Sequence, residues 1–374
     1  MNFRGLIVAI AVLGGCTSAV TTTDTSSSQP AHSGSCPETI IIHTNEMPMS
    51  DVGFLYQLLS TEYTIDAVNH TISAPLNSEN ADLNSSQLEI RHGGQVTNFE
   101  QVSALLHNDS DILLGLVDTD EAIALARMFP TKALFAPFQK SPDIIYWNPD
   151  VYPNATRIVD HNSWDIRVMY ADGAYFMQHL LTTQQLKPPQ PVNTYDGTPI
   201  PFIASGGMFL QQGLSTVDPY AYRYIYRDWM KDIAYQYIHE AGWTPYAMSV
   251  SATPDQIARN EKCLQILIPA LQQAMKDFLT SPESAIARIV DAARQFNSVW
   301  SYSPDQARAA LDIILNDGLI GSETSGAVGS FDPQRTSEFL QTFRQSFPDV
   351  TDSALTADRL VTNEFLDASI SLQP

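Results

Sequence analysis

The sequence is poor in charged residues and especially in basic ones. Charged residues make up 16% of the 374 positions, and 20 Lys and Arg stand against 41 Asp and Glu, which gives a net charge of −21. Such a chain has little with which to neutralise phosphates, so we expect no nucleic-acid partner and no binding to an anionic bilayer through surface charge. The balance also disfavours anionic ligands, although a helix N-terminus can overrule it locally.

The sequence also lacks the short motifs that mark many enzymes. It has no nucleophile elbow, no Walker loop and no His-Glu-x-x-His pattern, and its eight histidines are scattered. We therefore expect a protein that is not an enzyme and that needs neither a metal nor a cofactor.

An apolar run long enough to span a bilayer is missing after the N-terminal segment. Arg4 and the apolar run 6–13 form a short export signal. Leu-Gly-Gly-Cys at 13–16 fits the bacterial lipobox, in which the cysteine thiol carries the lipid. We expect residues 1–15 to be a lipoprotein signal peptide and Cys16 to anchor the chain outside the cytoplasm of a bacterium. The alternative is an ordinary signal peptide with a coincidental cysteine.

Cysteine is scarce, with three in the chain. Residues 16–35 are rich in Ser and Thr without apolar periodicity, which predicts a disordered tether. Beyond the tether, Cys36 and Cys263 form an even pair, and in an exported chain an even pair suggests a disulfide. Two separate buried thiols are the alternative, and the oxidising compartment favours the bond.

The stretch 111–147 sets the architecture of the folded body. Residues 112–117 form a continuous apolar run, typical of a strand buried on both faces of a parallel sheet. Asp118, Thr119 and Asp120 follow at once, and each can cap a helix over 121–128. Strands over 132–137 and 144–147 come next. In open α/β sheets a ligand lies at the carboxyl ends of strands, so we expect one to be met here.

Similar alternation of apolar runs and capped periodic segments continues along the chain. The expected strands are 39–43, 88–90, 112–117, 132–137, 144–147, 165–170, 200–204 and 247–252. The expected helices are 52–60, 99–106, 121–128, 175–181, 208–212, 254–267, 269–279, 282–296, 304–315 and 332–347.

These segments predict an α/β protein with two parallel-type sheets and flanking helices. The chain crosses from one lobe to the other near residues 140–147 and returns near 246–252. We therefore expect a bilobed clamshell hinged at two crossings. Lobe 1 comprises residues 36–140 plus 250–374, and lobe 2 comprises residues 141–249.

Several motifs along the folded body resemble one known family. The segments that carry the resemblance are the lipobox, Gly115, 119–122, Ala-Pro-Phe-Gln-Lys-Ser-Pro at 136–142, Asp-Pro-Tyr at 218–220, Trp229, 234–236, 239–246, 267–274, Pro282, Gly329 and 331–332. In order over the chain, they resemble the nitrate/sulfonate/taurine/thiamine-precursor group of ABC-importer substrate-binding lipoproteins.

The resemblance implies a type II periplasmic-binding-protein fold, a monomer, and an ABC permease as the membrane partner. Family members with pyrimidine ligands carry Asp-Trp-x-Pro after the first strand, whereas this chain has Asn-Glu-Met-Pro at 45–48 and lacks the stacking tryptophan. Eukaryotic pyrimidine synthases share the fold but carry a cysteine-rich iron motif. The body here has Cys36 and Cys263 alone, which agrees with a protein that is not an enzyme.

Strand-end loops supply the candidate binding residues. We expect ligand contacts from Asn45, Glu46, Thr119, Asp120, Asp172, Gly173, Tyr175, Asp218 and Tyr220. Carboxylates beside aromatic faces suit an amino-heterocycle or a cationic solute, through charge-assisted hydrogen bonds and stacking.

At several of these positions a purely structural role is the alternative to ligand contact. For Asp120 we favour a helix N-cap over a ligand contact, and for Asp172 neither role is preferred. Asp218 can be a turn residue before a proline, but the family resemblance favours ligand contact. Gly173 can simply permit a tight turn.

We therefore expect a lipid-anchored solute-binding protein of an ABC importer. Its solute is small, polar and nitrogen-bearing, with a thiamine-precursor-like pyrimidine as the first choice. One alternative is an anionic sulfonate or nitrate. The other is a surface sensor or adhesion module that kept the clamshell without a transport role.

The lipid anchor can be tested by replacing one residue. Because the lipobox places the acylated thiol at Cys16, the Cys16→Ser protein should leave the membrane fraction, and immunoblots of fractionated cells measure this. A Cys16→Ser protein that stays with the membrane contradicts the lipoprotein prediction.

Overall fold

The computed structural model describes residues 34–163, 166–187, 191–192, 195, 197–321 and 326–372. The predicted signal peptide, Cys16 and the tether up to residue 33 lie outside this part of the chain. Residues 34–374 form one compact unit. In the described residues, no helix combines the length and the apolar character that a membrane crossing requires.

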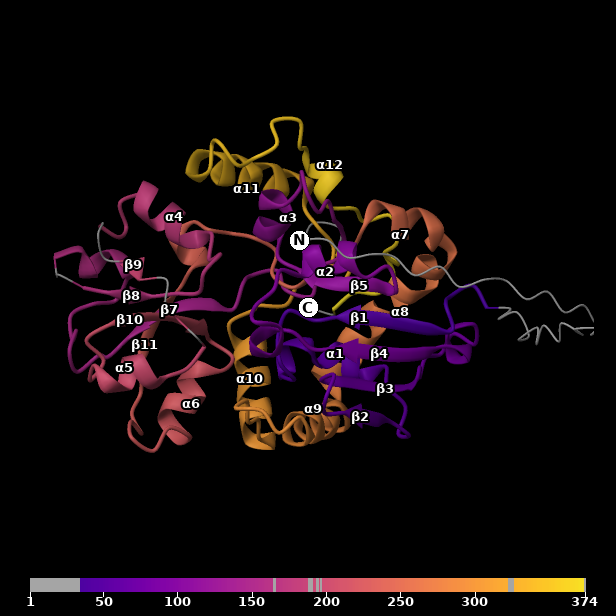
Figure 1. The fold of residues 1–374 in the computed structure, drawn as a ribbon, viewed down its shortest axis with the longest axis horizontal. Coiled ribbons are helices and arrows are strands. Elements are labelled where there is room, and N and C mark those ends of the chain that lie inside the picture. The colour runs from indigo at the N-terminus through magenta and orange to yellow at the C-terminus, as the bar shows by residue number, and fades with distance from the viewer. Residues whose placement is uncertain are drawn as a thin grey trace, which may run out of the picture. The chain divides into compact units, whose positions relative to one another are not determined.

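The strands form two sheets, which we call the large sheet and the small sheet (Figure 1). The large sheet has the order β2-β3-β4-β1-β5-β12-β6, and the small sheet has the order β11-β7-β10-β8-β9. The strands of the large sheet are β1 (Thr39–His43), β2 (Thr64–Asp66), β3 (Thr71–Pro75), β4 (Gln87–Arg91), β5 (Ile112–Val117), β6 (Lys132–Phe135) and β12 (Ser249–Ala252). Those of the small sheet are β7 (Asp143–Trp147), β8 (Val168–Met169), β9 (Pro191–Val192), β10 (Leu210–Leu214) and β11 (Ala234–Tyr237).

Both sheets are mixed, whereas we expected parallel-type sheets. In the large sheet β1 runs parallel to β4 and β5, but β12 is antiparallel to β5 and β6. In the small sheet β7 is antiparallel to β10 and β11. A buried apolar run carries no information on strand direction, so the sequence could not reveal these reversals. The predicted α/β class with two sheets and flanking helices is confirmed.

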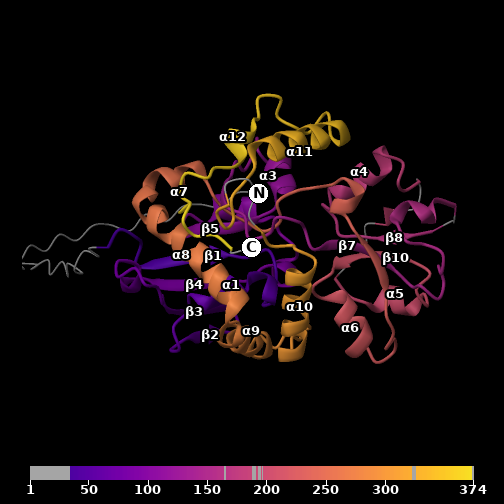
Figure 2. The same ribbon diagram turned by 180° about the vertical axis from the view of Figure 1, so that it is seen from behind.

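Helices cover both faces of the large sheet. Figure 1 shows α2 on the near face, and Figure 2 shows α8 across the opposite face. The helices are α1 (Gly53–Gln57), α2 (Val102–Asn108), α3 (Thr119–Ala124), α4 (Phe176–Thr182), α5 (Ile200–Ala204), α6 (Asp218–Tyr224), α7 (Pro254–Arg259), α8 (Glu261–Thr280), α9 (Glu283–Gln295), α10 (Pro304–Asn316), α11 (Pro333–Ser346) and α12 (Ala357–Leu360). Short 3-10 turns are η1 (Ser50–Val52), η2 (Leu83–Ser85), η3 (Gly94–Thr97), η4 (Ile158–Ser163) and η5 (His239–Ala241).

Prolines and small polar caps start the later helices, as the sequence predicts. Thr253, Ser303 and Asp332 each accept a hydrogen bond from a backbone N–H in the first turn of α7, α10 and α11, and a proline follows each cap. The predicted break at Pro269 is wrong, because α8 runs through that residue and the break falls at Asn260. Burial of Leu264, Ile268 and neighbouring side chains holds α8 together despite the missing N–H.

Two predicted elements of the small sheet are interchanged. Residues 200–204, expected as a strand, form α5, and much of 208–212, expected as a helix, belongs to β10. Pro201 sits in the first turn of α5, and Gly206 and Gly207, with φ of 68° and 76°, turn the chain out of it. A Cβ on Gly207 would lie 2.4 Å from Cβ of Asn148, so this close approach requires glycine.

The disulfide expected between Cys36 and Cys263 is present, and it joins positions 227 residues apart. Both cysteines are buried in the core that covers one face of the large sheet. The bond therefore ties the entry of β1 to the start of α8.

Removing the bond should destabilise the folded body. Entropy models give roughly 4–5 kcal/mol for closing a loop of this length, and measured values are often smaller. Cys36→Ser/Cys263→Ser should therefore lower the urea midpoint, and reduction of the wild type should lower it similarly. Two reactive thiols in the denatured, unreduced body would disprove the bond itself.

Candidate functional site

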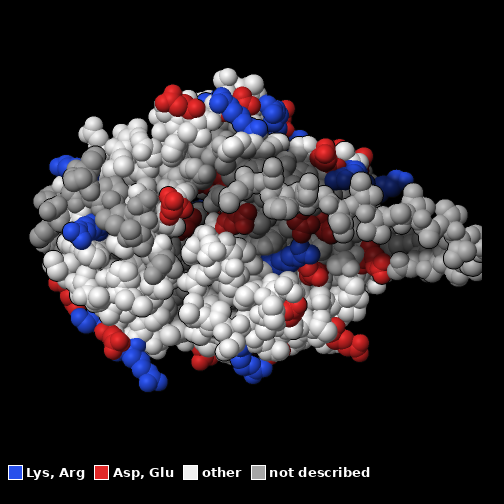
Figure 3. All heavy atoms as spheres, viewed as in Figure 1, with Lys and Arg blue, Asp and Glu red and all other residues white. Residues whose placement is uncertain are grey.

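A cavity of about 250 Å³ is walled by segments of both sheets. The large-sheet side supplies the loop after β1, the segment from η3 into α2, and the start of α3. The small-sheet side supplies the start of β7, the loop from β8 to α4, and the turn from β10 into α6. Acidic side chains lie along the middle of the molecular face in Figure 3, and basic ones lie mostly at its margins.

Acidic side chains dominate the charged part of the wall. The acidic lining residues are Glu46, Glu100, Asp118, Asp120, Glu121, Asp143, Asp172 and Asp218. Among the described residues that line the cavity, there is no Lys and no Arg. The cavity thus presents carboxylates to its contents without an opposing cation in its own wall.

The large-sheet carboxylates are held by the segment that returns from the small sheet. Asp118 Oδ1 accepts a hydrogen bond of 2.6 Å from the backbone N–H of Met248. Asp120 Oδ2 accepts one of 3.0 Å from the indole N–H of Trp243. Asp118, not Asp120, occupies the N-cap position of α3, so the predicted cap role of Asp120 is wrong, and its side chain bonds a tryptophan at the cavity wall instead.

Glu121 is fixed from the other side, by α2. Its Oε1 accepts hydrogen bonds from the Ser103 backbone N–H at 2.7 Å and from the Ser103 hydroxyl at 2.6 Å. The sequence predicted a strand-end acidic segment here without singling out Glu121. Its carboxylate reaches the wall because α2 packs beside β5 and turns Ser103 towards it.

On the small-sheet side, two of the carboxylates lie next to neighbouring strands, one at the start of β7 and one at the start of α6, just after β10. Asp143 begins β7 and pairs in register with Leu214 of β10. The backbone N–H of Leu214 donates to Asp218 Oδ2 at 2.8 Å. A Cβ on Gly213 would lie 2.2 Å from that oxygen, so Gly213 leaves the space that Asp218 occupies.

A chain of buried hydrogen bonds holds the loop that carries Glu46. The Thr44 hydroxyl donates to the Glu46 carbonyl at 2.6 Å, and His92 Nδ1 lies 3.1 Å from the same oxygen. His92 Nε2 lies 2.8 Å from the Tyr56 hydroxyl. Burial lowers the pKa of His92 to about 3, so the ring is neutral, and it can donate through Nδ1 while accepting from Tyr56.

Burial raises the pKa of most of these acids. Loss of solvation raises the pKa of Glu46 to about 8, with the charges of Asp51, Asp143 and Asp218 adding to the effect. Burial likewise raises the pKa of Glu121 and Asp218 to about 7, and that of Asp143 to about 6. The pKa of Asp118 and that of Asp120 are also raised by burial. Protons or a bound cation therefore stabilise this cluster near neutral pH.

Most of the expected ligand contacts line the cavity, but two of them do not. Asn45, Glu46, Asp120, Asp172, Gly173, Tyr175 and Asp218 lie in its wall. Thr119 is buried and donates its hydroxyl to the Tyr246 carbonyl at 3.1 Å. Tyr220 packs its ring against Tyr224, with centroids 4.9 Å apart, and does not line the cavity.

The wall also contains residues that the sequence did not point to. Gln95, Phe99, Asp143, Tyr226 and Trp300 all line the cavity. The Trp300 indole donates to the Pro48 carbonyl at 2.9 Å, and its ring stacks on Tyr302. Trp300 follows α9, far along the chain from the other wall residues, so no local pattern could identify it.

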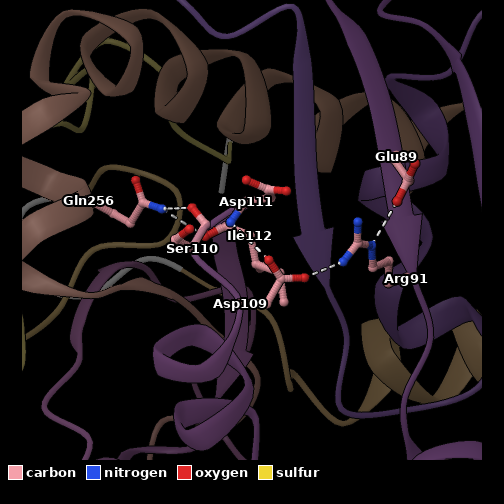
Figure 4. A network of polar contacts seen from close by, with 7 residues as sticks. All are labelled: Glu89, Arg91, Asp109, Ser110, Asp111, Ile112 and Gln256. Atoms are coloured by element: carbon pink, nitrogen blue, oxygen red, sulfur yellow. Dashed lines mark hydrogen bonds and ion pairs between the residues drawn. The ribbon is translucent and has the colours of Figure 1, made fainter. Parts of the chain in front are cut away.

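Arg91, the last residue of β4, is paired with two carboxylates. Its Nε lies 2.7 Å from Glu89, and its Nη1 lies 2.7 Å from Asp109. Figure 4 shows the guanidinium between these carboxylates. Beside it, Gln256 of α7 donates to the carbonyls of Ser110 and Ile112 at the start of β5. Arg91 is therefore part of the scaffold and not of the cavity wall.

The described residues contain no group of three or more His, Cys, Asp or Glu side chains placed to hold a metal ion. The acids of the wall are spread along both sheets and do not converge on one point.

Solved structures of solute-binding proteins share this fold. The periplasmic aliphatic sulphonate-binding protein SsuA of Escherichia coli matches with a TM-score of 0.57 and 12% identity over 87% of this chain and 92% of that one. The alkanesulfonate-binding protein SsuA of Xanthomonas axonopodis pv. citri, bound to MOPS, matches with 0.54 and 12% over 87% and 99%. The ligand-binding component of an ABC-type import system of Staphylococcus aureus, with zinc bound, matches with 0.55 and 9% over 88% and 98%.

No family model and no curated protein matches the sequence. At these identities the solved structures establish the fold, and they confirm the periplasmic-binding-protein architecture that the sequence resemblance implied.

The raised pKa values predict how the stability of the solute-free protein depends on pH. A carboxyl whose pKa is higher in the folded state keeps its proton after the unfolded state has lost it. The free energy of unfolding therefore falls as pH rises towards the folded-state pKa, by about 1.4 kcal/mol per unit. Between pH 5 and 8 the melting temperature should fall, because over this range folded Glu46, Glu121 and Asp218 keep protons that the unfolded chain has already lost, and above pH 8 the fall should level off.

Glu46→Gln provides the matched comparison for this pH dependence. It removes the carboxyl with a pKa of about 8 and keeps its shape. The variant should melt higher than the wild type at pH 8.5 and show a smaller fall, measured by circular dichroism. A wild-type melting temperature that rises over this range contradicts the prediction.

Proposed function

We propose that this protein is the solute-binding protein of an ABC importer, and that it encloses a small nitrogen-bearing solute with positive charge. One observation carries the proposal: a cavity walled by both sheets is lined by carboxylates, with no Lys or Arg among its described lining residues. The fold shared with solute-binding proteins supports the role of a receptor.

Residues 36–140 plus 250–374 form one lobe in this proposal, and residues 141–249 form the other. Direct bonds already join the two sides at the cavity. The Thr216 hydroxyl donates to Asp51 Oδ2 at 2.8 Å, and Gln95 Nε2 donates to the Gly197 carbonyl at 3.5 Å. A solute favours the closed arrangement only by touching both lobes, and the wall offers Glu46 from one and Asp218 from the other.

The chemistry of the wall favours a cationic or amine-bearing solute. Carboxylates accept charge-assisted hydrogen bonds from N–H donors, and such bonds are worth roughly 1.5–3 kcal/mol each. Tyr175, Tyr226 and Trp300 add aromatic faces that suit a ring or a cation. An aminopyrimidine resembling a thiamine precursor, the first choice from the sequence, is one solute of this class, and these rings would take the stacking role of the missing tryptophan.

An anionic sulfonate or nitrate is the second candidate. Its support is the shared fold, since solved relatives in fold include sulfonate-binding proteins from two bacteria. The wall chemistry favours the cation over it, because the paired Arg91 and the lack of other lining cations leave an anion without a charged partner.

The transport role includes a lipid anchor through Cys16, a monomeric receptor and a permease partner. A surface sensor or adhesion module remains the alternative from a different class. Uptake of the solute by a deletion strain separates the two, because a sensor is dispensable for uptake and a receptor is not.

Substitutions in the wall test which charge the solute carries. Asp218→Asn and Glu46→Gln keep side-chain shape and remove an acceptor charge, so each should weaken binding of a cationic aminopyrimidine about tenfold or more. Calorimetry at pH 7.5 measures the dissociation constants. Asp255→Asn, at an exposed position at the start of α7, is the matched control and should bind like the wild type.

MOPS serves as the anionic probe in the same assay. If the wild type binds MOPS and both wall variants bind it more tightly, the cavity takes anions and the second candidate replaces the first.

A further inference from the structure

The carboxylates of the cavity wall, which we call the row, come from both sides of the cavity. One end of the row is Asp218, which begins α6 after β10 of the small sheet. The other end is Glu121, which lies in α3 and is bonded to α2 beside the large sheet. Glu46, in the loop after β1, and Asp120, next to Glu121 in the chain, line the same cavity.

Each end of the row has acceptor capacity that the protein does not use. Asp218 is 9% exposed and Glu121 is 7% exposed, and both line the cavity. Asp218 receives its hydrogen bond at Oδ2, and Glu121 receives both of its bonds at Oε1. Within the described chain, Asp218 Oδ1 and Glu121 Oε2 have no hydrogen-bond donor, so two buried carboxylates each face the cavity with a free oxygen.

The acceptors that the wall offers to a solute are those of its carboxylates. Asn45 and Gln95 also line the cavity, but Asn45 Oδ1 and Gln95 Oε1 are buried away from it. An ammonium group has three donors and no acceptor, which matches a wall of carboxylates.

Apolar side chains share the wall with the acids. Met49, Val102, Phe176, Leu214 and Val217 line the same cavity. A volume of about 250 Å³ lies just under the roughly 300–1,000 Å³ of common ligand cavities, so the solute is small. Such a wall suits methylene groups between polar ends.

We propose that the solute is a linear aliphatic diamine or short polyamine, with one ammonium group at Asp218 and Glu46 and another at Asp120 and Glu121. This inference rests on the proposed function, because it specifies the cation that the same cavity binds. A single ammonium group can satisfy one end of the row, whereas a diamine satisfies both and bridges the two lobes.

Calorimetry on the wild-type body at pH 7.5 tests the inference without any substitution. The probes are butane-1,4-diamine, spermidine, butan-1-amine, an aminopyrimidine and MOPS. The diamine should bind about tenfold to a hundredfold more tightly than the monoamine, because only the diamine makes charge-assisted bonds at both ends.

Two isosteric variants then place the ammonium groups. Asp218→Asn and Glu121→Gln keep the oxygens that accept from Leu214 and Ser103 but remove the charge at one end each. Either variant should reduce the diamine's affinity towards that of the monoamine. Asp255→Asn should leave the ratio of the two affinities unchanged, and melting curves confirm that each variant is folded.

The outcomes separate this inference from the proposed function. Equal affinity for the diamine and the monoamine overturns the linear dication while leaving a cation receptor. Binding of the aminopyrimidine without either alkylamine overturns the inference and keeps the first choice above. Binding of MOPS alone overturns both. A wild type that binds none of these probes also overturns the diamine assignment.

Discussion

Desolvation of unpaired carboxylates is the constraint on which the site depends. Glu46, Asp118, Glu121 and Asp218 are drawn out of water by the packing of two sheets, and no Lys or Arg of the described wall compensates them. Removing an ionised carboxylate from water without a partner is costly, so the folded protein holds protons or takes a cation. The site is therefore destabilised when empty, and that free energy becomes available to a solute that donates hydrogen bonds.

The segment that returns from the small sheet is bonded to the acids at the start of α3. Met248 and Trp243 lie on this segment, and they donate to Asp118 and Asp120. Tyr246 of the same segment accepts from the Thr119 backbone and hydroxyl. The acids of α3 are thus bonded to a connection between the sheets. In the proposed clamshell, a solute that alters their charge would act directly on the segment that hinge motion must bend.

The sequence predicted elements well where the local pattern has one solution. The buried run Ile112–Val117 is a strand with the expected bounds, and capped, proline-led helices such as Pro304–Asn316 begin where expected. The short apolar run Ile200–Ala204 is compatible with either a strand or a helix. In the folded protein its tertiary packing favours the helix α5. The strand-end rule found Glu46 and Asp218, but Trp300 reaches the wall only through packing of distant segments, which no local signal records.

The shared fold does not identify a ligand, so our proposal rests on the chemistry of the wall. The fold supplies two sheets and a cavity between their connecting loops. The side chains of those loops determine the charge of the ligand that the cavity binds. Sulfonate-binding proteins use this architecture for anions, as their names record. In this chain the guanidinium of Arg91 is held by Glu89 and Asp109, and the described carboxylates of the wall include oxygens, such as Asp218 Oδ1 and Glu121 Oε2, that accept no hydrogen bond. The oxygens of an anionic solute would face the carboxylate oxygens of the wall without a donor between them. An ammonium group would instead donate hydrogen bonds to those buried carboxylates.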